Sequence, residues 1–202
     1  CNTYYPLIPG SEMKYSLLYA SGLKADAVVV VERLPDQNGN PVFSERTQII
    51  DSTGGLHKNS LDVKQYTCDA GKLQYLSRAE DNEVDGNKTR LDLTFSIPAV
   101  AFVEPKAVNQ GTSWTYSYSE KFQIPGQGQI DPKKKYNVQM SIMDTQDLTV
   151  PAGTFKTVKV EKRVDTTMIY EYYARGVGLV KRVLGDGTTW ELREFSGVKA
   201  EE

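Results

Sequence analysis

Alternation of apolar and polar residues along many short segments is the feature that most limits the folds open to this chain. Trp114, Tyr116 and Tyr118 alternate with small polar residues, and Leu91–Ile97 alternates in the same way. A period of two residues places successive side chains on opposite faces of a strand. No segment carries a sustained apolar stripe at the 3.6-residue period of a helix. The sequence therefore predicts a mainly β protein with few, short helices.

Clusters of turn-forming residues separate the alternating segments. Residues 36–41 read Asp-Gln-Asn-Gly-Asn-Pro after the β-branched run Ala27–Leu34. Residues 148–155 read as strand, tight turn and strand, and Gly-Asp-Gly at 185–187 precedes the last alternating segment. Such clusters favour hairpins between antiparallel strands. Residues 56–63 show no clear period and are expected to form a loop or one helical turn.

A short motif recurs about half a chain length away from its first copy. Residues 10–15 (Gly-Ser-Glu-Met-Lys-Tyr) resemble residues 111–116 (Gly-Thr-Ser-Trp-Thr-Tyr). In both copies a turn glycine precedes a strand with large apolar side chains on one face. We therefore expect a tether at residues 1–9 and one β domain at 10–202, with two similar β units at 10–100 and 106–198 as its suspected halves.

The charge balance excludes one broad class of partner. The chain has 24 basic and 26 acidic residues, for a net charge of −2. Binding to nucleic acid draws on a basic surface that displaces counterions from phosphates. The longest strongly apolar run, Ala27–Val31, is much shorter than the ~20 residues of a membrane-spanning helix. We expect neither a nucleic-acid partner nor a membrane span.

The position of one cysteine predicts a cellular location. The chain begins at Cys1, which resembles a mature bacterial lipoprotein, where a signal peptide is removed before a cysteine that carries the lipid. Asn2 fits sorting to the outer rather than the inner membrane. We thus expect a lipidated Cys1, membrane anchorage and a protein that faces the periplasm, with Cys68 as a small buried thiol. A disulfide between Cys1 and Cys68, or an arbitrary boundary of the sequence, would explain the same residues.

Three motifs, mainly in the second half, carry a resemblance to a known group. They are the Gly-x-x-Trp-x-Tyr of residues 111–116, the Val-Pro-Ala-Gly-Thr-Phe of residues 150–155 and the Tyr-Tyr-Ala-Arg-Gly-Val-Gly-Leu-Val of residues 172–180. Together they resemble small bacterial envelope lipoproteins of unknown function. The resemblance implies a curved antiparallel sheet, as a half-barrel, open barrel or sandwich like those of lipoprotein carriers. It implies no catalytic residues.

The residues that most enzymes and metal sites need are scarce. His57 is the only histidine, so a serine triad would need it as base with Ser52 or Ser60 as nucleophile, and neither serine lies in a Gly-x-Ser-x-Gly turn. One histidine and two distant cysteines cannot complete a zinc site. Residues 81–86 faintly resemble a calcium loop but lack its flanking helices. We expect no enzyme, no metal and no cofactor.

Two functions remain open from the sequence. A curved sheet could hold a lipid, an acyl chain or a peptide on a concave aromatic face, as a non-catalytic envelope binding protein. Alternatively, an assembly lipoprotein could dock an envelope protein through a sheet surface or edge. The same aromatic side chains could instead fill a core between two layers. The candidate ligand-binding residues are Trp114, Tyr116, Tyr118, Tyr170, Tyr172 and Trp190.

Overall fold

The structure is a computed structural model that describes residues 2–51, 58–69, 72–84, 86–103, 109–126 and 128–200, without the side chains of Asp51 and Lys58. Within these residues the regular structure consists of strands, turns and bends, with no helix. The strands are β1 (Glu12–Leu18), β2 (Lys24–Gln37), β3 (Asn40–Asp51), β4 (Lys58–Asp69), β5 (Lys72–Val84), β6 (Asn87–Phe95), β7 (Val100–Phe102), β8 (Ser113–Ile124), β9 (Gly128–Ile130), β10 (Lys135–Val150), β11 (Gly153–Val164), β12 (Thr167–Ala174), β13 (Gly178–Val183) and β14 (Thr189–Ser196).

Twelve of these strands form a closed antiparallel barrel. Their order is β10-β11-β12-β13-β14-β1-β2-β3-β4-β5-β6-β8, and β8 pairs again with β10. The closing pairs run from Lys135 opposite Ser119 to Ser141 opposite Ser113. β7 and β9 are additions that pair with β5 and β8. The antiparallel β prediction is confirmed, but the sheet is closed rather than half-open, because the β8–β10 ladder satisfies both edges.

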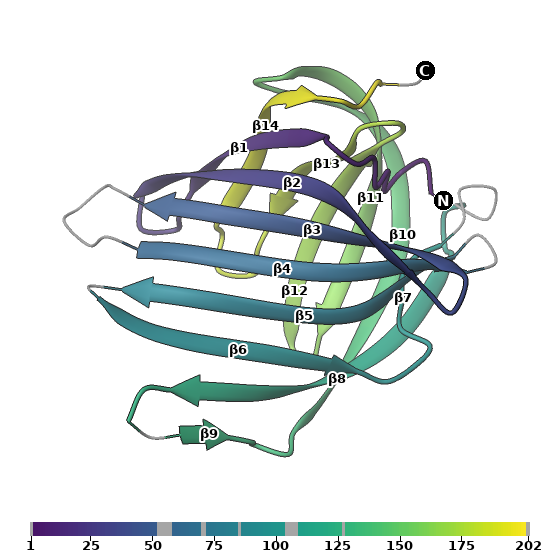
Figure 1. The fold of residues 1–202 in the computed structure, drawn as a ribbon. Coiled ribbons are helices and arrows are strands. Elements are labelled where there is room, and N and C mark those ends of the chain that lie inside the picture. The colour runs from purple at the N-terminus through teal and green to yellow at the C-terminus, as the bar shows by residue number, and fades with distance from the viewer. Residues whose placement is uncertain are drawn as a thin grey trace.

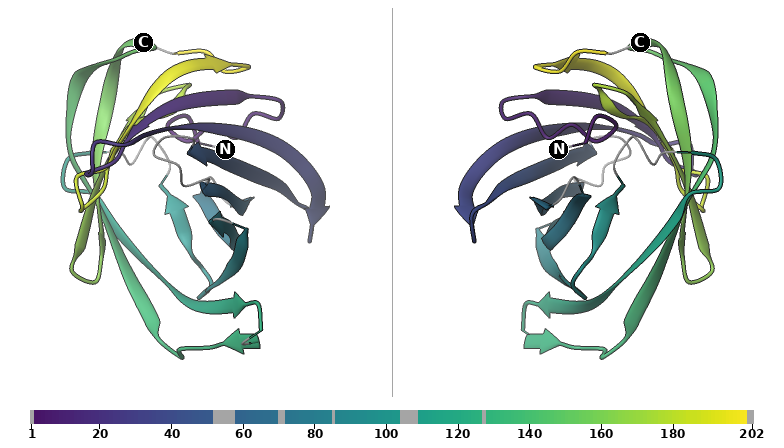
Figure 2. Two further views of the ribbon diagram at one scale, coloured as in Figure 1. Left: turned by 90° about the vertical axis from the view of Figure 1, so that its left-hand side faces the viewer. Right: turned by 90° about the vertical axis from the view of Figure 1, so that its right-hand side faces the viewer.

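The barrel is flattened into two walls whose strands cross steeply (Figure 1). β2–β6 run across the front wall in this view, and β10–β13 run nearly upright behind them. Figure 2 shows the two walls curving toward each other at the top, where β14 and β1 connect them, and at the bottom, where β8 runs from one to the other. Side chains on the inner faces of both walls therefore point into one shared interior.

Period-two burial explains why these segments form strands. On β2, Ala25, Ala27, Val29 and Val31 are buried and alternate with more exposed residues. β-branched side chains pack well on such a half-buried pleated surface. The buried residues form two apolar clusters, and Leu7 and Leu179 contact both of them.

The two halves of the barrel begin with the same hydrogen-bonded turn. The Gly10 amide donates to Val31 O at 2.8 Å, and the Gly111 amide donates to Ile142 O at 2.9 Å. The φ angles of the two glycines are 81° and 86°, in the left-handed region that favours glycine. Each turn precedes six barrel strands, β1–β6 in the first half and β8 with β10–β14 in the second.

The register of the strands defines which positions of the two halves are equivalent. From Val31, the residues that lie opposite one another on the next three strands are Glu45, Lys64 and Arg78. From Ile142, they are Val160, Glu171 and Arg182. In both halves the register shifts just before a buried tyrosine, between Gln65 and Tyr66 and between Tyr172 and Tyr173. The halves therefore place the same residue type at three equivalent positions, which are Tyr15 and Tyr116, Tyr66 and Tyr173, and Arg78 and Arg182. At other equivalent positions the residue types differ: Thr47 corresponds to Lys162, Glu45 to Val160 and Lys64 to Glu171.

The N-terminal segment packs against the barrel. Asn2 is buried, and its side-chain oxygen accepts hydrogen bonds from the amides of Tyr4 at 3.0 Å and Tyr5 at 3.1 Å. Its side-chain nitrogen donates to Val103 O, and the Gly176 amide donates to Thr3 O at 2.7 Å. These bonds bring Tyr5 into the interior.

Two local expectations are corrected. Residues 58–63, expected as a loop or a helical turn, belong to β4, because ten residue pairs from Lys58 opposite Asp51 to Thr67 opposite Val42 attach this strand to β3. Cys68, expected as a free buried thiol, is half-buried and disulfide-bonded. Cys1 lies outside the described residues, so its lipidation stays a prediction.

Candidate functional site

The barrel interior contains a cavity of about 290 Å³ that side chains of both walls line. A more open pocket of about 770 Å³ lies where β3–β6 end beside the β8–β9 hairpin. Ser60 is buried on β4 and lines both of them. The cavity and the pocket therefore share Ser60 in their linings, and small-molecule sites typically have volumes of about 300–1,000 Å³.

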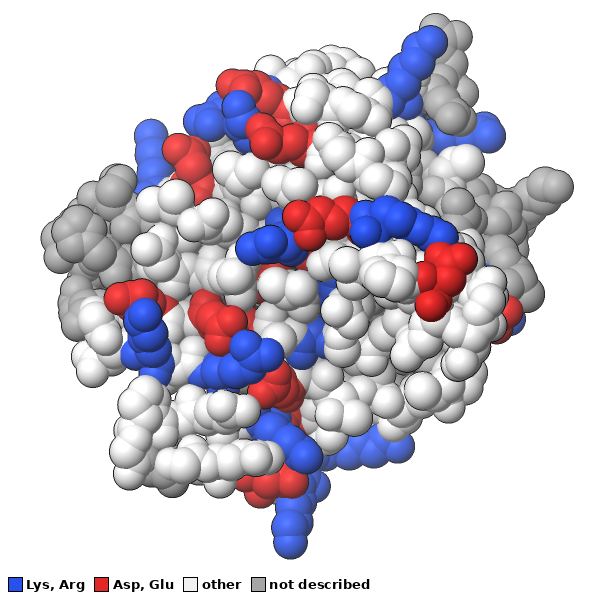
Figure 3. Space-filling model, in the orientation of Figure 1, with Lys and Arg blue, Asp and Glu red and all other residues white. Residues whose placement is uncertain are grey.

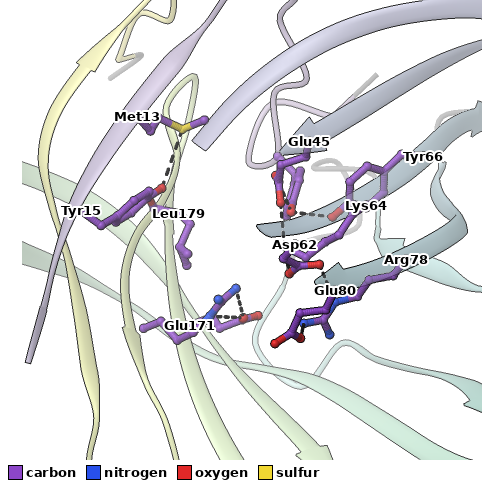
Figure 4. Close-up of polar contacts among 12 residues, drawn as sticks. Met13, Tyr15, Glu45, Asp62, Lys64, Tyr66, Arg78, Glu80, Glu171 and Leu179 are labelled. Atoms are coloured by element: carbon purple, nitrogen blue, oxygen red, sulfur yellow. Dashed lines mark hydrogen bonds and ion pairs between the residues drawn. The ribbon is translucent and has the colours of Figure 1, made fainter. Parts of the chain in front are cut away.

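A chain of ion pairs covers the front wall of the cavity (Figure 4). Glu45, Lys64 and Arg78 lie opposite one another on β3, β4 and β5. Lys64 Nζ is 2.8 Å from Glu45 Oε1 and 3.6 Å from Asp62 Oδ2. Arg78 donates from Nε to Asp62 Oδ1 at 2.8 Å and from Nη2 to Glu80 Oε2 at 3.2 Å. Strand alternation aims these side chains inward, where Glu45, Asp62 and Lys64 are mostly buried and Arg78 and Glu80 are 30% and 26% exposed.

A second ion pair lies on the back wall. Glu171 on β12 is opposite Arg182 on β13, and Arg182 Nε and Nη2 both lie 2.8 Å from Glu171 Oε1. The other carboxylate oxygen of Glu171 accepts a hydrogen bond from the Tyr173 hydroxyl at 2.8 Å. The Arg182 guanidinium also lies 5.3 Å from the centroid of the Trp190 ring, in a cation–π contact. The Glu171 side chain is only 5% exposed, so this pair is held away from water.

Tyr5 connects the N-terminal segment to both walls. Its hydroxyl donates to Glu45 Oε2 at 2.9 Å and lies 2.8 Å from the Tyr66 hydroxyl. Its ring centroid is 5.6 Å from that of Tyr66 and 5.8 Å from that of Tyr173. The tyrosines at equivalent positions of the two halves thus meet through a residue that precedes both halves.

The paired charges stay ionised in spite of burial. Burial raises the pKa of Asp62 and Glu171, but the neighbouring cations outweigh it and hold both values below the usual range. Burial likewise lowers the pKa of Lys64, and Glu45 and Asp62 outweigh that effect and raise it. Burial, followed by the Glu45 charge, raises the pKa of Tyr66 well above its usual value. The site therefore offers fixed charges and neutral phenols at neutral pH.

The outer surface contrasts with this interior. In Figure 3 the basic and acidic side chains of the visible face are interspersed, with no large area of one sign. Asp81, the first residue of the calcium hypothesis, pairs with a cation: Arg90 lies 3.2 Å from Asp81 and 3.0 Å from Asp92. An arginine that pairs with both carboxylates is ordinary surface electrostatics. The described residues contain no cluster of three metal-ligating side chains, and Asp85 lies outside them.

Of the six aromatic residues expected to bind a ligand, Trp190 lines the cavity. Tyr116 is buried against Tyr75, with centroids 5.4 Å apart. The remaining four also pack against neighbouring side chains. Trp114 lies 5.6 Å from Phe102, Tyr118 stacks on Tyr136 at 5.1 Å, and Tyr170 and Tyr172 lie near Lys159 on the opposite face of β12 from Glu171.

The residues of the serine-triad hypothesis are only partly described. Ser60 lies on β4 in the lining of both the cavity and the pocket, whereas Ser52 and His57 lie outside the described residues.

The Lys-Lys-Lys segment at 133–135 is exposed, and Lys134 pairs with Asp165 at 3.1 Å.

Sequence reasoning missed the charged lining of the cavity. Asp62 and Lys64 alternate with Leu61 and Val63, and a period-two reading places the apolar pair inside. The structure places the charged pair inside instead. A signal was present in the opposite charges of β4 and β5, but only the register brings Arg78 of β5 within reach of Asp62 of β4.

Together, these features define a closed β-barrel with a polar, aromatic-lined interior and an adjoining open pocket. The family model described as DUF3108-like matches residues 11–183, and the chain belongs to this family. Among solved structures, the chain is similar to a candidate exported protein with a YmcC-like fold from Bacteroides fragilis, with a TM-score of 0.54 and 13% identity over 97% of this chain and 100% of that one.

It is also similar to a candidate lipoprotein from Parabacteroides distasonis, with a TM-score of 0.52 and 16% identity over 97% of this chain and 99% of that one. At such identities the likeness establishes the fold alone. No curated protein matches the chain. The part of the chain that the structure describes has no helix with the length and apolarity to cross a membrane.

Proposed function

We propose that this protein is a non-catalytic binding protein of the bacterial envelope that holds a small amphipathic ligand inside its barrel. The observation that carries the proposal is the cavity of about 290 Å³, whose wall combines ion pairs, tyrosine hydroxyls and Trp190. Buried charges are expensive, and apolar side chains of similar volume usually stabilise a core as well or better. Retention of several such charges beside empty space supports a role in recognising a ligand.

The cavity suits a ligand with both polar and apolar parts. The ion pairs of both walls offer donors and acceptors, and Ile49, Met140 and Ile169 offer apolar contacts in the same cavity. The pocket of about 770 Å³ shares Ser60 with the cavity, and in our proposal it is the route inward past Ser60 and holds the longer part of the ligand. These features favour an amphiphile over a purely apolar lipid.

Placement in the envelope is supported by the two structural neighbours, one described as exported and one as a lipoprotein. The chain has two cysteines, so a thioether-linked lipid on Cys1 and an intramolecular disulfide at Cys68 exclude each other. Thiol titration of the denatured protein separates the two states. Lipidated protein will show one free thiol and the intramolecular disulfide will show none, and intact-mass measurement will detect the acyl groups.

A docking role is the second candidate, and β9 is the feature that favours it. Gly128–Ile130 is exposed, pairs only with β8 among the described strands, and places the half-exposed Ile130 at the edge. An open strand edge can accept a strand of an envelope partner. Its three residues provide a short template, so we rank this function below ligand binding.

A blocked passage tests the proposed function. Ser60→Phe places a ring between the cavity and the pocket, and Val63→Phe places the same ring on the other face of β4 as the control. A dansyl-labelled fatty acid will bind the unchanged protein and the control, with energy transfer from tryptophan, and binding to Ser60→Phe will fall at least tenfold. Equal binding by both variants, with circular dichroism showing both folded, would refute a luminal site.

A further inference from the structure

Building on the proposed function, we infer that the luminal ligand carries one anionic group and that Lys162 on β11 binds this group. The inference begins with the pairing of the cations that line the cavity, which are Lys64, Arg78, Lys162 and Arg182. Three of them have a carboxylate within 2.8 Å, whereas the described residues provide no carboxylate within 4.0 Å of Lys162. Lys162 is thus the lining cation without an ion-pair contact among the described residues, although its charge acts on Glu171 from farther away and helps to lower the pKa of that carboxyl.

Each carboxylate around the cavity already has a partner. Glu45 accepts from Lys64 and Tyr5, Asp62 and Glu80 accept from Arg78, and Glu171 accepts from Arg182 and Tyr173. A cationic ligand would therefore compete with cations that these carboxylates already contact. An anionic ligand would add a partner to Lys162 without breaking any of these contacts.

The corresponding position in the other half of the barrel has a different residue type from Lys162. The equivalent position of the first half is Thr47, which is buried and lines the same cavity. The arginines of the two halves, Arg78 and Arg182, occupy equivalent positions and are both paired. A threonine satisfies this position in one half, so the fold does not need a cation there.

The apolar side chains that line the cavity indicate the chemistry of the rest of the ligand. Ile49, Met140, Ile169 and Leu184 line the cavity together with Trp190 and Ala101. An aliphatic body fits these side chains, so the ligand class is an anionic amphiphile with one carboxylate or phosphate head.

Matched probes test the inference. Laurate, lauryl phosphate and lauryl alcohol share one aliphatic chain and differ in the head group. Calorimetric titration will show laurate, lauryl phosphate or both binding at least tenfold more tightly than the alcohol. The preferred head distinguishes a fatty-acid-like from a phospholipid-like ligand. Lys162→Gln will remove this preference and leave affinity for the alcohol unchanged.

Lys159→Gln is the control, because Lys159 lies on the same strand, is also half-buried, and occupies the opposite face beside Tyr170. It will bind all three probes like the unchanged protein. If the alcohol binds as tightly as both anions, or if Lys162→Gln retains the preference, the anion inference is overturned while the luminal binding function stands. If the protein binds no probe, both the inference and the proposed function are overturned.

Discussion

Replacement of Glu171 by glutamine measures how strongly the back wall depends on its ion pair. Glutamine keeps the shape of the side chain but removes the charge that Arg182 contacts at 2.8 Å and reduces its ability to accept from Tyr173. The Glu171 and Arg182 side chains are 5% and 22% exposed, so the arginine would remain as a largely buried, unpaired cation. Removal of one member of a buried pair costs about 3–5 kcal/mol, and the partial exposure of Arg182 places our expectation near the lower limit, about 3 kcal/mol.

The neighbouring pair of Lys181 and Glu191 provides a matched control. Lys181 Nζ lies 2.7 Å from Glu191 Oε1, but the side chains of Lys181 and Glu191 are 25% and 35% exposed. Glu191→Gln should therefore cost at most about 1 kcal/mol. The double variant Glu171→Met with Arg182→Met removes both buried charges, and we expect it to be more stable than Glu171→Gln.

Urea unfolding followed by tryptophan fluorescence measures these differences. Trp190 lies beside Arg182 and reports on the site directly. A loss of about 3 kcal/mol corresponds to a fall in melting temperature of roughly 6–12 °C for a chain of this size. If Glu171→Gln is no less stable than Glu191→Gln, the pair contributes no more than a surface pair, and the reasoning from burial is wrong.

Three further predictions address the pH response, the N-terminal segment and one glycine. Asp62 and Glu171 have depressed pKa values in the fold, so their contribution to stability is present above their unfolded-state pKa values. This contribution will be lost as pH falls below about 4 through the folded-state pKa values. Urea unfolding between pH 7 and pH 2 will show the loss, and constant stability would contradict it. Tyr5→Ala should lower the free energy of unfolding by about 2 kcal/mol or more and Tyr5→Phe by about 1 kcal/mol, and equal losses would assign the whole effect to the hydroxyl. Gly197 and Gly187 both have positive φ, but an added Cβ lies 2.9 Å from the backbone of a neighbouring turn only at Gly197, so thermal unfolding should show a larger loss for Gly197→Ala, and similar losses would count against the contact.

Strand positions were accessible from the sequence because alternation is a local property. Trp114, Tyr116 and Tyr118 do lie on one strand, and the turn at Gly153 does separate two strands. Residues 58–63 were not accessible in this way, because β4 carries charged residues on its inner face. The rule that polar residues of a strand face the exterior gives a wrong prediction wherever the interior of the barrel is itself polar.

The candidate site depended on contacts far apart in the chain. Among the six aromatic residues chosen from the sequence, the structure brings Trp190 to the cavity beside Arg182. The charged lining joins Asp62 and Arg78 of the first half to Glu171 and Arg182 of the second. No local pattern carries this information, because it is the closure of the barrel that brings the two walls together.

The sequence by itself determined the β class, many of the turns and the recurrence of one glycine turn about half a chain length apart. These features follow from side-chain period and backbone preference, which act over a few residues. The tertiary structure decided that the sheet closes between β8 and β10 and that Lys162 faces the cavity without a carboxylate partner among the described residues. Both depend on register between distant strands, where a shift of one residue would move every side chain to the other face.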